Sequence, residues 1–444
     1  MIAPGRSEPR IAVLLPVAYF GGTLRLVLNV VRSFASRSVA RVVFGVPADH
    51  LPAIEDEYSA LRAECPHVEV RPFRWRCLDR DAAACCATAA GLEVGAFISS
   101  TYQLPADAGA FFCDCDFWFF VSDRLVHPLV PLRPYGVLVT DHLQRYAPAI
   151  FDASMYGNPD GPVWDFLRNV RTADVVAATS AATARDVVSY AGALGHVVRI
   201  PTTIDIDHFL ALAGGHASAD GAAESVTADR AAPYFVWVTN SSQHKNHLRT
   251  LRALRLYLDT LGGALDVVVT GLWTDLFDPD LPAERIGDRR AVWDEPYVRS
   301  VRDAVRTTLG AWRRRVHFRG AVPDAEYVGI VRDARFLLHN VLADNGTYSV
   351  VEAAILGRRS ISSDYPQMRE IDTEFGLGMR FFDGCDPLAT AHALLDGERL
   401  PLAAHADPAV VANIRRHGWR GADEALVAAI HDAIRAPRRA LSYL

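Results

Sequence analysis

Short apolar runs alternate with amphipathic stretches along the first half of the chain. The runs are continuous and rich in β-branched and aromatic residues, which is typical of strands that a parallel sheet buries on both faces. After residue 23, Leu24, Val27 and Val31 recur at helical spacing, and we predict helices there and over residues 181–190. Strands are predicted at residues 11–17, 42–46, 68–70, 117–121, 136–140, 175–178 and 197–200.

The same alternation restarts in the second half of the chain. Before it, residues 211–233 are mostly alanine, glycine, serine and aspartate, a composition that predicts a linker or a mobile loop. Helices are predicted over residues 248–258 and 349–356 and through most of the tail at 408–437. Strands are predicted at residues 235–238, 267–270, 316–318, 336–339 and 359–362.

This organisation predicts an α/β protein with two Rossmann-like doubly wound domains facing across a cleft. We place an N-terminal domain at residues 1–205, a linker at 206–233 and a C-terminal domain at 234–423. A helical tail at residues 424–444 is expected to pack back on the N-terminal domain. In doubly wound sheets, ligands bind beyond the carboxyl ends of the strands, so polar residues that follow strands are the functional candidates.

Composition narrows the class of protein. Half of the 444 residues are hydrophobic, 22% are charged and the formal net charge is −6, which indicates a folded chain without a nucleic-acid partner. No apolar stretch reaches the roughly 18–20 residues of a membrane span, and the polar start is unlike a signal peptide. Seven cysteines without a CxxC pair favour buried thiols in a reducing compartment. We expect a cytoplasmic protein and leave open a peripheral contact at the inner face of the cell membrane.

One cation stands apart from the others. Lysine and arginine together number 46, yet Lys245 is the single lysine of the chain. An ammonium on a slim stem fits where a planar guanidinium does not, so this position is a candidate for a tight anion site. Chance is an equally good explanation on this evidence alone.

The segment from Asp344 to Glu352 carries the sharpest candidate chemistry. It follows a predicted strand and enters a predicted helix, and its two carboxylates are eight positions apart. Gly346, Thr347 and Ser349 between them offer backbone N–H groups and a hydroxyl cap at a helix N-terminus, which suits a diphosphate. The competing interpretation is an ordinary capped helix in which Glu352 pairs with an arginine.

A second polar segment, residues 238–247, follows the first strand of the C-terminal domain. Asn240, Ser241 and Ser242 form a polar turn, and Lys245 lies at the start of a predicted helix. A cation and hydroxyls in this position again suit phosphate. An ordinary strand-to-helix loop with an exposed lysine remains the alternative.

Taken together, these segments resemble family 4 of the retaining glycosyltransferases, which have the GT-B fold. Lys245-Asn-His247 resembles the lysine of the family's donor site, and Asp344 and Glu352 fall on the two acids of its E-x7-E motif. The stretches that complete the resemblance are residues 266–271, 316–320, 324–334, 352–357 and 362–364, with Glu370.

The resemblance implies a role for each matching residue. Lys245 would neutralise the diphosphate, Asp344 would hold the donor sugar, and Glu352 would bind the ribose hydroxyls. Backbone N–H groups of Thr347 and Tyr348 would contact phosphate. The remaining residues assigned to the nucleotide-sugar site are Gly21, Gly22, Asn240, Ser241, Gly271, Asn345, Gly346 and Ser349.

Three departures leave the donor sugar open. Asn240 stands where the family usually has an arginine, and the first acid is Asp344 instead of a longer glutamate. Asn345-Gly-Thr347 replaces the usual Gly-Phe-Gly. The long segment 272–300 carries Trp273 and Trp293, which either stack on a sugar or base or belong to the packing.

The N-terminal half resembles the family less closely. Gly21 and Gly22 fit a glycine loop that lets backbone approach the donor, and residues 201–205 match an interdomain turn. Asp141 and His142 lie where the family has a pair facing the acceptor, and we assign both to catalysis. A structural histidine at a strand end is the equal alternative for His142.

These expectations define a retaining hexosyltransferase that moves a sugar from a nucleotide-diphosphate donor to a hydroxyl of a glycan, lipid-linked or other acceptor in bacterial surface polysaccharide synthesis. Four Asp-x-Asp sequences occur in unrelated contexts, so we assign no metal and no other cofactor. No Gly-x-Gly-x-x-Gly follows the first strand, which argues against a dehydrogenase. A nucleotide-sugar epimerase of the same fold and a non-catalytic scaffold for nucleotide sugars or glycans are the alternatives.

Overall fold

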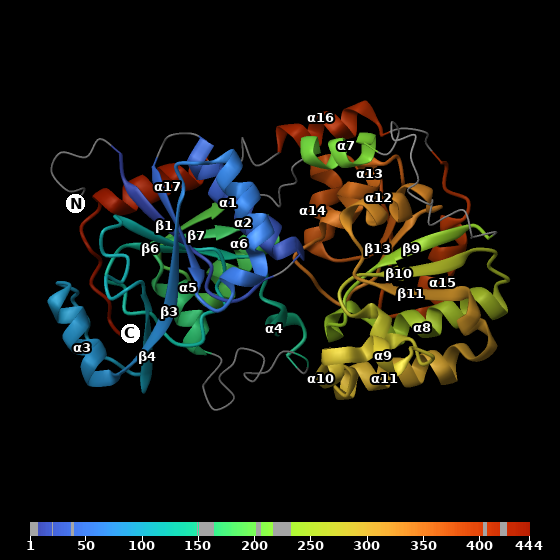
Figure 1. Ribbon diagram of the computed structural model, residues 1–444, viewed down its shortest axis with the longest axis horizontal. Helices are drawn as coiled ribbons and strands as arrows, with labels where there is room; N and C mark the ends of the chain where they lie inside the picture. Colours follow the sequence, from blue (N-terminus) through green and yellow to red (C-terminus); the bar gives the residue numbers. More distant parts are fainter. Residues whose placement is uncertain are drawn as a thin grey trace. The chain divides into compact units, whose positions relative to one another are not determined.

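The protein folds into two compact units (Figure 1). The computed structural model describes residues 8–19, 21–36, 40–148, 150, 164–200, 206–215, 232–402, 406–417 and 424–444. Unit 1 comprises Met1–Ile204 and His417–Leu444, and unit 2 comprises Asp205–Arg416.

Unit 1 is built on an eight-stranded sheet in the order β4-β3-β2-β1-β5-β6-β7-β8, parallel except for the antiparallel pair β3 and β4. Its strands are β1 (Arg10–Leu14), β2 (Arg41–Pro47), β3 (Glu69–Asp79), β4 (Thr101–Ala106), β5 (Phe117–Phe120), β6 (Tyr135–Val139), β7 (Val175–Ala178) and β8 (His196–Arg199). Its helices are α1 (Gly21–Ser36), α2 (Glu55–Glu64), α3 (Arg80–Ala89), α4 (Leu143–Tyr146), α5 (Trp164–Thr172), α6 (Ala181–Asp186) and α17 (Glu424–Arg435).

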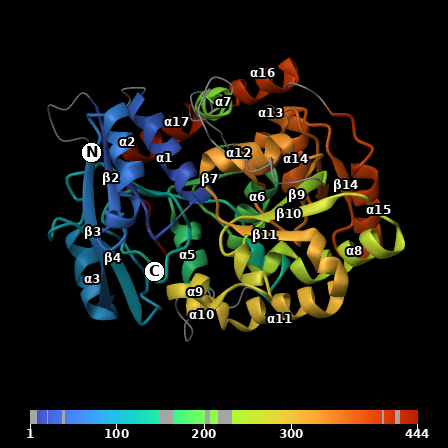
Figure 2. The ribbon, with the colours of Figure 1, turned by 45° about the vertical axis from the view of Figure 1, so that its right-hand side comes forward.

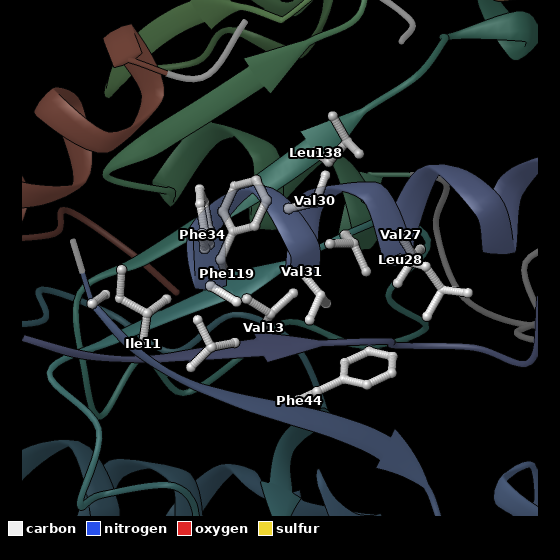
Figure 3. Packing of buried hydrophobic residues seen from close by; sticks show 14 of the residues in the cluster. Ile11, Val13, Val27, Leu28, Val30, Val31, Phe34, Phe44, Phe119 and Leu138 are labelled. Carbon is white, nitrogen blue, oxygen red and sulfur yellow. The ribbon is translucent and has the colours of Figure 1, made fainter. Parts of the chain in front are cut away.

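The continuous apolar runs of unit 1 arise because helices cover both faces of its sheet. In β1, Ile11 and Val13 face the cluster that contains α1, whereas Ala12 and Leu14 belong to the cluster on the opposite face. Figure 3 shows Val13 beneath Val31 of α1, with Phe44 of β2 nearby. Every position of such a strand is buried, so it shows no polar alternation.

The last part of the described chain returns to unit 1. Leu426 and Ile430 of α17 are buried in the same cluster as Ile11 and Val13. Further along, residues 438–444 run beside residues 93–98, where the Leu441 N–H donates to the Glu93 carbonyl and the Leu444 N–H to the Ala96 carbonyl, each at 2.8 Å. Unit 1 is therefore assembled from two separate parts of the sequence.

Unit 2 contains a six-stranded parallel sheet in the order β11-β10-β9-β12-β13-β14. Its strands are β9 (Tyr234–Val238), β10 (Asp266–Thr270), β11 (Val316–Gly320), β12 (Leu337–His339), β13 (Ser360–Ser363) and β14 (Arg380–Phe382). Its helices are α7 (Ile206–Gly215), α8 (His247–Arg255), α9 (Ala283–Ile286), α10 (Arg290–Trp293), α11 (Pro296–Ala304), α12 (Asp324–Asp333), α13 (Tyr348–Ile355), α14 (Pro366–Phe375), α15 (Pro387–Gly397) and α16 (Pro408–Arg416). Figure 2 shows α12, α13 and α14 on one face of this sheet and α8 and α11 on the other.

Several details differ from the sequence predictions. The expected linker begins with the helix α7, because Ile206 and Phe209 lie three positions apart and are both buried; residues 216–231 are outside the described part of the chain. The change from unit 2 to unit 1 falls at His417 and not at residue 424. Strands β4 and β14 were not predicted, and β4 makes the first sheet mixed instead of fully parallel. Within the described ranges, no helix combines the length and apolar character needed to cross a bilayer.

Candidate functional site

The strand order of the unit 2 sheet reverses between β9 and β12. From β9 the chain continues to β10 and β11 on one side, and β12, β13 and β14 follow on the other. Loops at the carboxyl ends of strands on either side of such a point form the usual ligand crevice of doubly wound sheets. The two polar segments singled out in the sequence are these loops, and they touch where the Leu342 N–H donates to the His244 carbonyl at 2.8 Å.

Lys245 and Asp344 form an ion pair at this point. Lys245 ends a single 3-10 turn, Gln243–Lys245, and its Nζ donates a hydrogen bond to Asp344 Oδ2. Only 14% of the lysine side chain and 7% of the aspartate side chain are exposed. The lysine is therefore not an exposed loop residue, and the two groups expected on diphosphate and sugar neutralise one another.

Asp344 is held as a carboxylate by the groups around it. Its Oδ1 accepts a hydrogen bond from the Asn345 N–H at 2.8 Å, and His339 Nε2 lies 3.9 Å from Oδ2. Burial favours the neutral acid, but the Lys245 charge outweighs it and holds the pKa of Asp344 well below its usual range. The site thus presents a fixed negative charge beside a cation.

The N-terminus of α13 lies in the same loop as Asp344. Thr347 caps this helix, and its Oγ1 accepts a hydrogen bond from the Ser349 N–H at 3.3 Å. Gly346 has a φ of +97°, and a Cβ atom there would lie 2.2 Å from Cδ1 of Ile371, so the turn requires glycine. The helix begins at Tyr348, and the N–H groups in the first turn of a helix point away from its body, which makes this end suited to an anion.

Glu352 lies one turn inside α13 and is buried. Its Oε2 accepts a hydrogen bond from the Tyr327 hydroxyl at 2.7 Å, and Tyr327 comes from α12. The sequence singled out Glu352 but gave no sign of Tyr327, because the contact joins two separate helices.

The loop after β9 is held by its own polar groups. Asn240 Oδ1 accepts from the Ser242 N–H at 3.0 Å, and the Ser241 N–H donates to the Leu272 carbonyl at 3.2 Å. Gly271 has a φ of +132°, and a Cβ there would lie 1.7 Å from the Thr239 carbonyl oxygen, so only glycine lets the two loops approach this closely. Asn240, Ser241 and Gly271 therefore shape the turn that carries Lys245.

The segment 272–300 supports the same turn. His247 is fully buried between two hydroxyls, with Nδ1 2.8 Å from Tyr297 Oη and Nε2 3.1 Å from Thr239 Oγ1, and burial lowers its pKa to about 3. The Tyr297 hydroxyl also donates to the Gln243 carbonyl at 3.3 Å. Trp273 and Trp293 pack against the core of unit 2, and the Arg302 guanidinium lies 3.5 Å from the centre of the Trp293 ring. The packing alternative therefore holds for both tryptophans.

Unit 1 has a second polar cluster at the carboxyl ends of β1, β5 and β6. The strand order of this sheet reverses between β1 and β5. After β1, the Tyr19 hydroxyl is hydrogen-bonded to Ser122 Oγ, 2.6 Å away. After β5 and β6, Arg124 Nη2 donates to Asp141 Oδ1 at 2.9 Å, and Asp123 Oδ2 lies 3.9 Å from His142 Nδ1.

Asp123 is the residue of this cluster that sequence reasoning missed. It is 1% exposed, and neither carboxylate oxygen has a hydrogen-bond partner among the described residues. Burial raises the pKa of Asp123 to about 7 and lowers that of His142 to about 4. Its one sequence signal is its position just after the aromatic strand β5.

The glycines near α1 differ from expectation. Gly21 and Gly22 form the first turn of α1 and not the loop before it. Phe20 and residues 201–205 lie outside the described part of the chain.

No group of three or more histidine, cysteine, aspartate or glutamate side chains among the described residues is arranged to hold a metal ion. Cys65 and Cys115 are buried, and burial raises the pKa of the Cys115 thiol to about 12. Cys77, Cys85 and Cys385 are exposed, so the prediction of buried thiols is wrong for these three.

No protein-family model and no curated protein sequence matches the chain. Solved structures resemble it over nearly its whole length. HepE from Anabaena in complex with UDP and glucose is 13% identical, with a TM-score of 0.61 over 96% of this chain and 100% of that one. A glycosyltransferase from Rickettsia africae is 10% identical, with a TM-score of 0.61 over 97% and 100%. A UDP-forming α,α-trehalose-phosphate synthase from Burkholderia vietnamiensis is 12% identical, with a TM-score of 0.62 over 97% and 100%. With its two parallel-sheet α/β units, the chain therefore has the GT-B fold of these glycosyltransferases.

Proposed function

We propose that the protein is a retaining glycosyltransferase that moves a sugar from a nucleotide-diphosphate donor to a hydroxyl of a glycan, lipid-linked or other acceptor. The observation that carries the proposal is the buried Lys245–Asp344 pair at the point where the strand order of the unit 2 sheet reverses. The fold is shared with HepE structures that contain UDP and UDP-glucose, which supports a nucleotide sugar as the donor. Bacterial surface polysaccharide synthesis in the cytoplasm is the setting we propose.

The donor half of the reaction is assigned to unit 2. Lys245 would turn from Asp344 toward the diphosphate, and the N-terminus of α13 would offer the N–H groups of Thr347 and Tyr348 to phosphate. Asp344 would then accept hydrogen bonds from the donor sugar. Glu352, already an acceptor for Tyr327, would bind the ribose hydroxyls.

The acceptor half is assigned to the cluster in unit 1. Asp123 has lone pairs without a donor and a pKa of about 7, so near neutral pH it can accept a hydrogen bond from an incoming hydroxyl group. His142 is neutral at that pH because burial lowers its pKa to about 4. Arg124 contacts both acids, with Nη2 2.9 Å from Asp141 Oδ1 and Nε 3.7 Å from Asp123 Oδ1. We favour Asp123 for direct contact with the acceptor because neither of its carboxylate oxygens has a hydrogen-bond partner among the described residues.

In the proposed reaction, the bond between the anomeric carbon and the diphosphate oxygen breaks, and the acceptor oxygen attacks from the same face. The configuration at the anomeric carbon is retained, and the acceptor proton leaves with the diphosphate. Lys245 and the α13 N-terminus stabilise the charge that develops on the leaving group, which is the main contribution of such a site. We therefore propose that transfer needs no metal and continues in the presence of a chelator.

Titration of the purified protein with a panel of nucleoside diphosphates tests the donor assignment. UDP or another member of the panel should bind, and Lys245→Ala should weaken that binding by ten-fold or more, since a charge-assisted contact contributes about 1.5–3 kcal/mol. Arg290→Ala removes an exposed cation from α10 and is the matched control. Equal affinity in Lys245→Ala and wild type would contradict the proposal, and transfer to an added acceptor separates it from epimerisation or mere binding.

A further inference from the structure

His339 ends β12 and lies beside the Lys245–Asp344 ion pair. Its ring is buried, and its Nε2 atom is 3.9 Å from Asp344 Oδ2, the oxygen that accepts the hydrogen bond from Lys245. Nε2 has no hydrogen-bond partner among the described residues. A buried ring nitrogen without a partner is unfavourable, so its retention at this position needs a reason.

The contacts of the other ring nitrogen, Nδ1, indicate which tautomer the neutral His339 ring adopts. Nδ1 lies 3.2 Å from Ser362 Oγ, and that hydroxyl donates its own proton to the Ser363 carbonyl at 3.0 Å. Because the Ser362 hydroxyl proton is directed to the Ser363 carbonyl, we assign the ring proton to Nδ1, which leaves a lone pair on Nε2 in the neutral form. Burial lowers the pKa of His339, the nearby Asp344 carboxylate raises it and the Lys245 charge lowers it, and the net result is a lowered pKa. In the free protein, this lone pair faces a carboxylate.

Asp344 depends on Lys245 for its second oxygen. Oδ1 accepts from the Asn345 N–H, whereas the donor that the structure shows on Oδ2 is the lysine. If an anionic ligand draws the ammonium away, Oδ2 remains a buried charge without compensation, which is strongly unfavourable. His339 Nε2 is placed to supply a replacement once it carries a proton.

We propose that His339 takes up a proton at Nε2 when a nucleoside diphosphate draws Lys245 to its phosphates, and that the imidazolium then holds Asp344 in place of the lysine. One proton passes from solvent to Nε2, and no bond in the ligand is made or broken. His339 is thus a positioning residue that keeps Asp344 charged and oriented toward the donor sugar. The inference rests on the proposed function, because it needs an anion at Lys245.

The charges around His339 favour this exchange. Lys245 from the turn after β9, Asp344 from the loop after β12 and Ser362 from β13 face His339. His244, in the same turn as Lys245, faces Asp344. The Tyr365 ring, 6.0 Å from the His339 ring, stays neutral because burial raises its pKa. Phosphates at Lys245 would cancel the positive charge that opposes protonation and leave Asp344 facing the imidazole.

Proton uptake makes nucleotide affinity depend on pH. Binding coupled to one proton weakens by up to about ten-fold for each pH unit in the range where the bound form is protonated and the free form is not. Isothermal titration calorimetry with UDP, in two buffers of equal pH and different ionisation enthalpy, counts the protons taken up. Wild type should take up more protons than His339→Gln, whose amide donates to Asp344 without one. His392→Gln, at an exposed position on α15, is the matched control and should behave as wild type.

The outcomes separate this inference from the proposed function. An equal proton count in wild type and His339→Gln, or a loss of uptake in His392→Gln instead, would overturn the role of His339. If His339→Gln does not fold, the wild-type affinity for UDP above neutral pH, where UDP is fully ionised, decides: it must fall as pH rises, and a flat profile overturns the inference. Absence of UDP binding, or binding unaffected by Lys245→Ala, would count against the proposed function with UDP and not against His339 alone.

Discussion

Two buried carboxylates that follow strands have pKa values shifted in opposite directions. Asp344 in unit 2 has Lys245 as a partner, and this charge holds its pKa well below the usual range despite burial. Asp123 in unit 1 has no hydrogen-bond donor among the described residues, and burial raises its pKa to about 7. The same residue type thus provides a fixed charge at one site and a titrating group at the other.

Asp123→Asn should stabilise the protein at alkaline pH. The native state keeps the proton of Asp123 up to about pH 7, whereas the unfolded chain loses it near pH 4. The unfolded state therefore binds fewer protons between these values, so the free energy of unfolding falls as the pH rises through this range. Replacement by asparagine removes this loss and should raise the free energy of unfolding by about 2–4 kcal/mol above about pH 8, and by only about 1–2 kcal/mol near about pH 5.

Urea denaturation at both pH values measures this difference, and Asp207→Asn, an exposed position on α7, is the control. The variant should also transfer sugar far more slowly, because Asp123 is the residue proposed to accept a hydrogen bond from the acceptor hydroxyl. A residue kept for function often reduces stability. An Asp123→Asn protein that shows the same pH dependence as wild type would mean that Asp123 is ionised in the fold.

The residues of the proposed donor site were singled out in the sequence, but their arrangement was not predicted. Lys245 and Asp344 each follow a predicted strand, which placed them at the carboxyl edge of a sheet. Their ion pair joins positions 99 residues apart, and pairing at that separation has no local sequence signal. Asp123 was missed because its burial, and not its neighbours in the chain, sets it apart.

At the scale of elements, the segment between β10 and β11 reinforces the turn that carries Lys245. Helix α11 brings Tyr297 to the His247 ring and to the Gln243 carbonyl, and both contacts hold the start of α8. The segment thus contacts the proposed donor turn through the Tyr297 hydroxyl and through the Leu272 carbonyl, which accepts from the Ser241 N–H.

Tyr297→Phe removes both hydrogen bonds and leaves the ring in place. His247 Nδ1 then loses its partner inside the core, which should lower the free energy of unfolding by about 1–3 kcal/mol. The turn would lose its support, so UDP affinity should fall several-fold. Calorimetry and thermal unfolding measure both effects, with Tyr58→Phe on α2 of unit 1 as the matched control. Unchanged affinity in a destabilised variant would limit Tyr297 to a structural role.

The sequence predicted elements well where periodicity was strong. Strand β7 has the predicted bounds 175–178, and the fold class is confirmed by the two sheets and the GT-B neighbours. Strand β4 was missed because Gln103 and Pro105 interrupt its apolar pattern, and proline is unfavourable in a ladder. Strand β14 has only three residues, Arg380–Phe382, too few to show a period.

At the scale of the whole molecule, unit 1 depends on a helix that is distant in sequence. Ile430 of α17 is fully buried in the cluster with Ile11 and Val13. Ile430→Ala should therefore destabilise unit 1 by about 2–4 kcal/mol through the cavity it leaves. Hydrogen exchange measured by mass spectrometry should show faster exchange in β1, β7 and β8, with β9, β10 and β12 unchanged. Equal loss of protection in the two units would show that they unfold together.

The return of α17 to unit 1 also determines when that unit can be completed on the ribosome. Residues 205–416, which form unit 2, are synthesised between the two parts of unit 1. At roughly 5–20 residues per second, the helix that covers β7 and β8 emerges on the order of ten to forty seconds after the sheet that it covers. During that interval the apolar face of β7 and β8 that α17 covers, with Val175 and Ala177, stays exposed on the nascent chain while unit 2 is already able to fold. Chaperones bind apolar surface of this kind.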